Sequence, residues 1–138
     1  MTDINTAIAA LKSGFSGTLI LPSDAGYDTA RTVMYGGNDK RPGAIARVKT
    51  AADVQRVVNV ARDTGVEFAI RSGGHSNAGH STSEGGLVLD LRDMRAISVD
   101  PTSRTLTASA IRTLRIGLSF AAAGRHASQA RLGGSRVR

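Results

Sequence analysis

The sequence contains no cysteine and no tryptophan, and it has only two tyrosines and three phenylalanines. Without cysteine the chain forms no disulfide, offers no thiolate to a metal and has no cysteine nucleophile. The few aromatic rings leave little material for stacking on nucleic-acid bases. No apolar run approaches the roughly 20 residues of a membrane-spanning helix, so no membrane span is expected. With 41% hydrophobic and 21% charged residues, the composition is typical of a soluble globular protein.

The length of 138 residues suits one compact domain. An early acid, Asp3, stands at the amino terminus, and no basic stretch precedes an apolar core there. A secretory signal is therefore not expected, and the sequence predicts a cytoplasmic location.

Acidic residues are missing from the end of the chain. Residues 1–110 contain twelve lysines and arginines against eleven acids, a net charge of +1, whereas residues 111–138 contain six arginines and no acid. The overall charge of +7 therefore comes mostly from the last segment and does not indicate a basic face on the body of the protein.

Periodicity predicts a mixed α+β order of elements. Helices are expected at 4–11 and from Thr50 onward, and a helical turn capped by Ser23 or Asp24 is expected to run toward Met34. Strands are expected at 17–22, 45–48, 66–70 and 86–91, of which 45–48 has alternating character. A hairpin is expected over 97–108, with a turn at Asp100-Pro101-Thr102-Ser103. The clearest pattern is a capping box of Thr50 and Asp53 before an apolar face of Val54, Val57, Val58 and Ala61, which Gly65 ends. The strand–helix–strand order predicts a parallel pair, and such sheets bind ligands beyond the carboxyl ends of their strands.

A glycine-rich run, Arg71-Ser72-Gly73-Gly74-His75-Ser76, follows the predicted strand 66–70 directly. Two adjacent glycines let the backbone approach a ligand closely and present bare N–H groups, which suits a phosphate or pyrophosphate. The arginine, serines and histidine add charge, hydroxyls and an imidazole. Plain turn chemistry is the alternative for an isolated Gly-Gly pair. The position of the run at a strand end favours a nucleotide cofactor.

A series of segments resembles the amino-terminal part of the FAD-linked oxidases of the berberine-bridge type, which carry a PCMH-type FAD-binding domain. The resemblance covers about residues 27–110 and is carried by Ile45–Val48, Thr50–Val54, Arg71–Ser76, Gly86–Leu91, Met94 and Val99–Pro101. Its ordered spacing is more specific than any single glycine motif.

The resemblance implies that this loop wraps the pyrophosphate of FAD and that His75 is bonded covalently to the flavin 8α-methyl group. The cofactor-binding residues that it implies are Arg71, Ser72, Gly73, Gly74, His75, Ser76 and Gly79. A neutral imidazole nitrogen is a competent nucleophile. Asp90 is expected to support the site structurally, no catalytic residue is assigned, and no metal site is expected, because His75 and His80 lack a well-placed third ligand.

The sequence also departs from the family. Relatives that attach the flavin a second time use a cysteine, so at most one histidyl bond is expected here. The resemblance stops near Ala110, before the substrate domain with its catalytic base. The expected function is thus the FAD-binding portion of a truncated FAD-linked oxidoreductase, which acts on a small-molecule substrate only if the missing segments complete it. We divide the chain into a partial FAD-binding domain, residues 1–110, and an arginine- and alanine-rich tail, residues 111–138.

Two explanations of the tail stay open. The change in composition where the resemblance ends suggests a reading-frame shift or a mistaken gene boundary, whereas the helical spacing of Ile111, Leu114 and Leu118 suggests an ordinary basic helix. An alternative function also follows from the tail: a nonenzymatic basic protein that contacts nucleic acid or an anionic membrane through its arginines. The family resemblance favours flavin binding over this alternative, and no nucleic-acid partner is expected.

Overall fold

The computed structural model describes residues 4–109, and the chain divides after Asp93 into two units that are described separately here. The predictions made for residues 111–138 lie outside the described part. Among the helices of the described residues, none is both long and apolar enough to cross a membrane.

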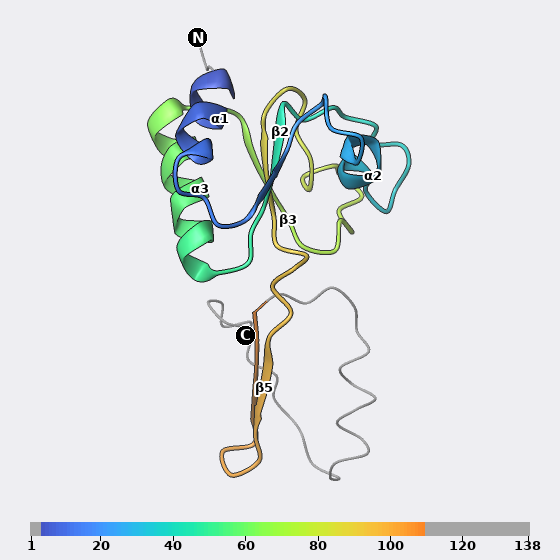
Figure 1. The fold of residues 1–138 in the computed structure, drawn as a ribbon. Helices are drawn as coiled ribbons and strands as arrows, with labels where there is room; N and C mark the ends of the chain where they lie inside the picture. Colours follow the sequence, from blue (N-terminus) through green and yellow to red (C-terminus); the bar gives the residue numbers. More distant parts are fainter. Residues whose placement is uncertain (1–3, 110–138) are drawn as a thin grey trace. The chain divides into compact units, whose positions relative to one another are not determined.

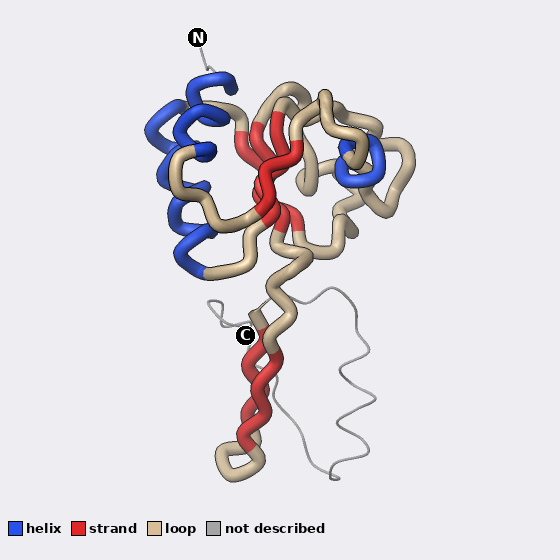
Figure 2. Tube along the Cα trace, in the orientation of Figure 1, coloured by secondary structure: helices blue, strands red, loops and turns tan. Residues whose placement is uncertain are grey.

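The first unit is built on a four-stranded sheet with the order β1-β2-β4-β3 (Figure 1). The strands are β1 (Thr18–Ile20), β2 (Ala44–Arg47), β3 (Phe68–Arg71) and β4 (Leu87–Asp90). Helices α1 (Ile4–Lys12) and α3 (Ala51–Thr64) lie on one side of the sheet and α2 (Tyr27–Arg31) lies on the other, as Figure 2 shows by colour. The predicted α+β class is confirmed.

The strands on either side of α3 run in the same direction, but they are not neighbours. β4 lies between β2 and β3 and pairs in parallel with both, whereas β1 pairs antiparallel with β2. The expected parallel pair is therefore a parallel triplet whose middle strand comes last in the sequence. The carboxyl ends of all three strands meet at one edge, where Arg47, Asp90 and Arg71 are in register.

Strands β2 and β4 are buried along nearly their whole length. The core on the α2 side of the sheet contains Ile20, Tyr27, Ala30, Ile45, Ala69 and Val88. The alternating character predicted for residues 45–48 is wrong, because elements cover both faces of the sheet and residues 44–46 are all fully buried.

Helix α3 begins and ends as the sequence predicts. The Thr50 hydroxyl accepts a hydrogen bond from the Asp53 N–H at 3.1 Å, and the Asp53 carboxylate accepts one from the Thr50 N–H at 3.1 Å, which completes the capping box. Gly65 ends the helix in the left-handed conformation with φ +63°. One expectation for the apolar face is wrong: Val58 is 40% exposed, whereas Val57 is fully buried.

Helix α2 begins differently from the prediction. Its N-cap is Gly26, which makes no side-chain capping bond, and the helix ends at Arg31 instead of extending toward Met34. The Asp24 carboxylate accepts a hydrogen bond from the Leu21 N–H at 2.8 Å. Asp24 therefore closes the turn after β1 instead of capping the helix. Aspartate side chains commonly accept backbone hydrogen bonds in turns in this way.

The buried Asp53 carboxylate makes stability depend on pH in a defined direction. Hydrogen bonds from the Ser16 hydroxyl and from the Lys49 and Thr50 backbones lower the pKa of Asp53 to about 2. A lowered folded-state pKa adds stability that is present above the ordinary value near 3.8 and is lost as pH falls through the folded value. We therefore expect the difference in unfolding free energy between wild type and Asp53→Asn to shrink between pH 4 and pH 2, measured by urea denaturation. A difference that stays constant over this range would contradict the assignment.

The second unit contains an antiparallel hairpin of β5 (Ile97–Asp100) and β6 (Thr105–Ala108). The Asp100 carboxylate accepts hydrogen bonds from the Thr102 N–H at 2.9 Å and the Ser103 N–H at 3.2 Å, which closes the connecting turn. The hairpin predicted from the sequence is confirmed.

Candidate functional site

The glycine loop, defined here as residues 72–80, leaves the carboxyl end of β3 at the edge where β2 and β4 also end. Gly74 and Gly79 adopt φ values of +71° and +75°. This left-handed region strains residues that carry a Cβ, so the path of the loop depends on glycine at both positions. The expected position of the loop, beyond the end of a parallel strand, is confirmed.

Five consecutive backbone N–H groups of the loop, those of residues 73–77, have no hydrogen-bond acceptor within the described residues 4–109. Nearly all buried N–H groups in folded proteins are paired, so the unpaired N–H of the buried Gly74 requires an explanation. Successive N–H groups in a turn with left-handed residues form a concave donor set that suits phosphate oxygens. The loop therefore has the geometry of an anion site.

The predicted site residues differ in exposure. Gly74 and Gly79 are buried, Ser72, Gly73 and Ser76 are half-buried, and His75 is exposed. Nothing in the part of the chain that the structure describes forms a hydrogen bond or ion pair with the His75 ring. The Ser76 hydroxyl accepts a hydrogen bond from the His80 N–H at 3.1 Å, and the Ser76 carbonyl accepts one from the Gly79 N–H at 3.3 Å. Ser76 thus closes the loop and leaves the imidazole accessible.

Arg71, the last residue of β3, points into the protein. Its side chain is 1% exposed and donates to the Asp90 carboxylate at 2.8 Å, the Ala30 carbonyl at 2.7 Å and the Arg31 carbonyl at 3.2 Å. Its own carbonyl accepts from the Leu91 N–H. The guanidinium is therefore committed to the interior and holds the start of the glycine loop against β4 and the end of α2.

Asp90 is the centre of an ionic cluster at this edge of the sheet. The carboxylate is fully buried, and it also contacts Arg92 Nε at 2.8 Å and Arg47 Nε at 3.7 Å. Burial lowers the pKa of Arg71, and the Asp90 carboxylate opposes that shift. Asp93 lies 4.0 Å from Arg47 at the rim. Because arginines outnumber carboxylates in the cluster, the edge carries net positive charge, which favours an anion nearby.

A second segment lies against the glycine loop and was not predicted from the sequence. The Met34 N–H donates to the Gly74 carbonyl at 3.2 Å, and the Asn38 Nδ2–H donates to the Asn77 carbonyl at 3.3 Å. These pairs are about 40 positions apart, so spacing gives no signal of the contact. The adjacent Gly36-Gly37 pair is the only local hint of an irregular segment there.

Metal binding has no support from the geometry around the two loop histidines. Over the residues that the structure describes, no group of three or more His, Cys, Asp or Glu side chains could hold a metal ion. His75 and His80 are both exposed.

Residues 42–115, more than half of the chain, match the FAD binding domain family. The chain is 44% identical over 84 residues to (R)-6-hydroxynicotine oxidase of Paenarthrobacter nicotinovorans, a match that covers 61% of this chain and 18% of that protein. The chain therefore spans about a fifth of the length of this relative.

Solved structures show the same relationship. A variant of BBE-like 1 from Physcomitrella patens superimposes with a TM-score of 0.75 at 26% identity, over 86% of this chain and 26% of that one. Glucooligosaccharide oxidase from Acremonium strictum, described with a 6-S-cysteinyl, 8α-N1-histidyl FAD, gives a TM-score of 0.64 at 28% identity, over 70% of this chain and 21% of that one. The chain belongs to the FAD binding domain family, and its fold is the amino-terminal part of the FAD-binding domain of FAD-linked oxidoreductases of the berberine-bridge type.

Proposed function

We propose that the glycine loop binds the diphosphate of FAD through the N–H groups of residues 73–77 and that His75 forms the covalent bond to the flavin. The observation that carries this proposal is the run of five N–H donors that find no acceptor among residues 4–109, on the loop that carries an exposed imidazole. The diphosphate supplies the acceptors that the loop lacks, and the positive charge around Asp90 favours it further. The residues present therefore fit the group.

The other predicted site residues take roles that follow from their placement. Gly74 and Gly79 allow the left-handed turns of the loop, and Gly73 leaves room for close backbone approach. Ser72 is half-buried next to the donor run, and the half-buried Ser76 belongs to that run and closes the loop through its hydroxyl, which accepts from the His80 N–H. Arg71 acts through position, because its guanidinium is bonded to Asp90 and the α2 carbonyls.

Covalent attachment requires an accessible ring nitrogen, which His75 provides. When bound, FAD supplies the 8α-methyl carbon and accepts the two electrons and two protons released as the C–N bond replaces one C–H and one N–H bond, and dissolved oxygen then takes these up as hydrogen peroxide. The imidazole loses its N–H proton and becomes the tether. These 138 residues include no cysteine, so a second, cysteinyl bond of the kind named for the Acremonium oxidase cannot form from them.

We infer that the whole protein is an FAD-linked oxidoreductase that removes a hydride from an alcohol, amine or carbon centre of a small molecule. The relatives are oxidases and FAD-linked oxidoreductases, and the segments that would bind substrate correspond to the larger part of their length. This similarity favours a flavoprotein over a basic protein that contacts nucleic acid or an anionic membrane.

The test is covalent flavin retention. The chain is expressed with riboflavin supplied, precipitated with acid and washed, and the pellet is examined for flavin fluorescence. We expect the fluorescence to stay with the protein and, after proteolysis, to map by mass spectrometry to the peptide that contains His75. Loss of all flavin into the acid supernatant would contradict covalent attachment.

A further inference from the structure

The segment between α2 and β2 contacts the glycine loop at Gly74 and Asn77. Here we call residues 32–38 the clamped loop. Its two hydrogen bonds to the glycine loop, Met34 N–H to the Gly74 carbonyl and Asn38 Nδ2–H to the Asn77 carbonyl, reach the residues on either side of His75. The backbone of His75 therefore lies between two points that a single neighbouring segment supports.

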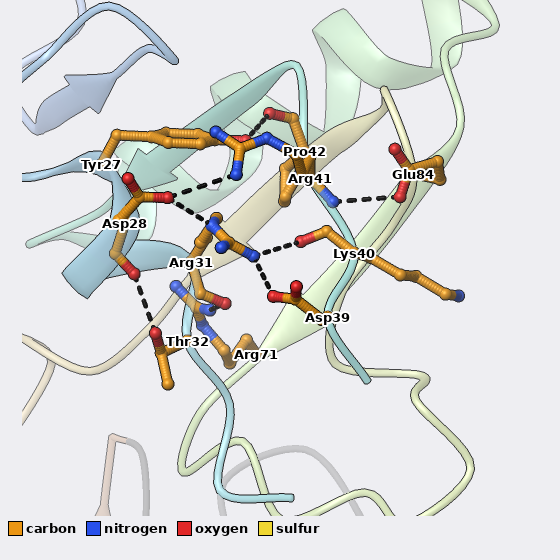
Figure 3. A network of polar contacts seen from close by, with 10 residues as sticks. All are labelled: Tyr27, Asp28, Arg31, Thr32, Asp39, Lys40, Arg41, Pro42, Arg71 and Glu84. Atoms are coloured by element: carbon orange, nitrogen blue, oxygen red, sulfur yellow. Dashed lines mark hydrogen bonds and ion pairs between the residues drawn. The ribbon is translucent and has the colours of Figure 1, made fainter. Parts of the chain in front are cut away.

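Arg31, the last residue of α2, ties the far end of the clamped loop back to that helix (Figure 3). At the start, Arg31 Nε bonds the Asp28 carboxylate at 2.7 Å, and the Thr32 hydroxyl donates to the Asp28 carbonyl at 2.8 Å. At the far end, Arg31 bonds the Asp39 carboxylate and donates to the Lys40 carbonyl at 3.4 Å. The hydrogen bonds of Thr32 and Arg31 thus hold the two ends of the loop near the end of α2.

Core packing holds only the start of this loop, where Val33 is 8% exposed. Met34 and Tyr35 are 63% and 41% exposed, and an added Cβ at Gly36 or Gly37 would meet nothing within 4 Å. Burying apolar surface is therefore a small part of what the middle of the loop contributes to the fold. The contacts that hold the rest of the loop in place are those of Met34 and Asn38 with residues 74–79.

Asn38 fits the glycine loop in two ways at once. Its amide donates to Asn77, and its Oδ1 lies so close to Gly79 that a Cβ on that glycine would collide with it. The left-handed conformation of Gly79 thus brings the backbone directly onto the Asn38 side chain. One residue defines both the position of the Asn77 peptide and the path of the loop at Gly79.

We propose that Asn38 is a positioning residue for flavin attachment, which acts by fixing residues 74–79 and so directing His75. This inference rests on the proposed function of the loop and adds a residue outside the glycine motif to it. Attachment needs the ring nitrogen within reacting distance of the methyl carbon, and a misplacement of about 1 Å can lower such a rate by up to about a hundredfold.

The test compares Asn38→Ala and Asn38→Asp with Asn59→Ala, a half-buried asparagine on α3. Asn38→Asp keeps the size of the side chain and removes the N–H donor, so it separates the hydrogen bond from packing. The first measurement is the ¹⁵N relaxation order parameter of residues 74–79 in the flavin-free chain. The second is the rate of covalent flavin incorporation, followed by fluorescence of acid-precipitated protein.

We expect order parameters of about 0.85 for residues 74–79 in wild type and Asn59→Ala, and of below about 0.6 in both Asn38 variants. Flavin incorporation should slow at least about tenfold in the Asn38 variants and stay at the wild-type rate in Asn59→Ala. Unchanged order parameters in both Asn38 variants, or incorporation at the wild-type rate, would overturn the role of Asn38. If wild type incorporates no flavin, the proposed tether is wrong, and the order parameters still decide whether Asn38 fixes the loop.

Discussion

Replacing Asp90 by asparagine should remove a large part of the stability of this fold. The carboxylate is fully buried and is the ion-pair partner of Arg71, whose side chain is 1% exposed. The variant keeps the shape of the side chain but leaves the guanidinium charge buried without a counter-charge. Breaking a buried pair in this way costs about 3–5 kcal/mol. Since a domain is typically stable by only about 5–15 kcal/mol, the expected loss is a large part of the total.

Asp93→Asn is the matched control, because it changes the same residue type three positions away. Asp93 is partly exposed and lies 4.0 Å from Arg47, so its ion pair should contribute no more than about 1 kcal/mol. Urea denaturation followed by circular dichroism measures both variants. An Asp90→Asn protein that unfolds within about 1 kcal/mol of the control would show that Arg71 does not depend on this carboxylate.

If Asp90→Asn does not fold, a double variant still tests whether the buried charge of Arg71 depends on the Asp90 carboxylate. Asp90→Leu with Arg71→Met removes both charges, and apolar replacement of a buried ion pair is often neutral or stabilising. We expect this protein to fold. A double variant that is no more stable than Asp90→Asn would indicate that the hydrogen bonds from Arg71 to the Ala30 and Arg31 carbonyls are the larger contribution.

His75→Ala should abolish covalent flavin while leaving the fold intact. The imidazole is exposed and makes no hydrogen bond or ion pair with any described residue, so its loss should change the unfolding free energy by no more than about 0.5 kcal/mol. Without a nucleophilic ring nitrogen on the loop beside the donor run, no bond to the 8α-methyl carbon is expected. The effect is a complete loss, and acid precipitation with fluorescence measures it.

His80→Ala is the control for this result. His80 is an equally exposed histidine of the same loop, and its backbone N–H, which the substitution retains, is the group that bonds Ser76. This variant should retain covalent flavin at the wild-type level. Covalent flavin that persists in His75→Ala, or that disappears in His80→Ala instead, would assign the tether to a different residue.

The elements that sequence analysis predicted correctly are those determined by local signals. The capping box of Thr50 and Asp53 and the left-handed Gly65 define both ends of α3 within a few residues of sequence. The hairpin of β5 and β6 is likewise predicted from the Asp-Pro turn between its strands. In each case the residues that determine the structure are neighbours in the chain.

The predictions that failed depend on contacts that are distant in sequence. The insertion of β4 between β2 and β3 is a choice among strand partners, which no spacing encodes. The burial of residues 44–46 in β2, where alternation was expected, follows from elements that cover both faces of the sheet. The ion pair of Arg71 with Asp90, 19 positions later, was not predicted either, although both residues stand at the ends of apolar strands.

Only part of the candidate site could be predicted from the sequence. The glycine loop and its place at the end of β3 are evident from Gly73, Gly74 and the apolar strand before them. Asn38 was not predicted, because its contact with Asn77 spans 39 positions and its own neighbourhood carries no motif. Local sequence signals therefore indicate the glycine loop, which presents the N–H donors, but not the clamped loop that supports it.

The most direct measurement of the central claim is a titration of the ¹⁵N-labelled, 138-residue His75→Ala chain with FAD, observed at the backbone amides. This variant cannot form the tether, so the spectra report reversible binding at the loop. If the diphosphate accepts hydrogen bonds from the loop, the amide resonances of residues 73–77 should show the largest shifts, and ADP, which shares the diphosphate, should move the same group. Shifts that are absent from residues 73–77, or that occur chiefly elsewhere, would contradict the account.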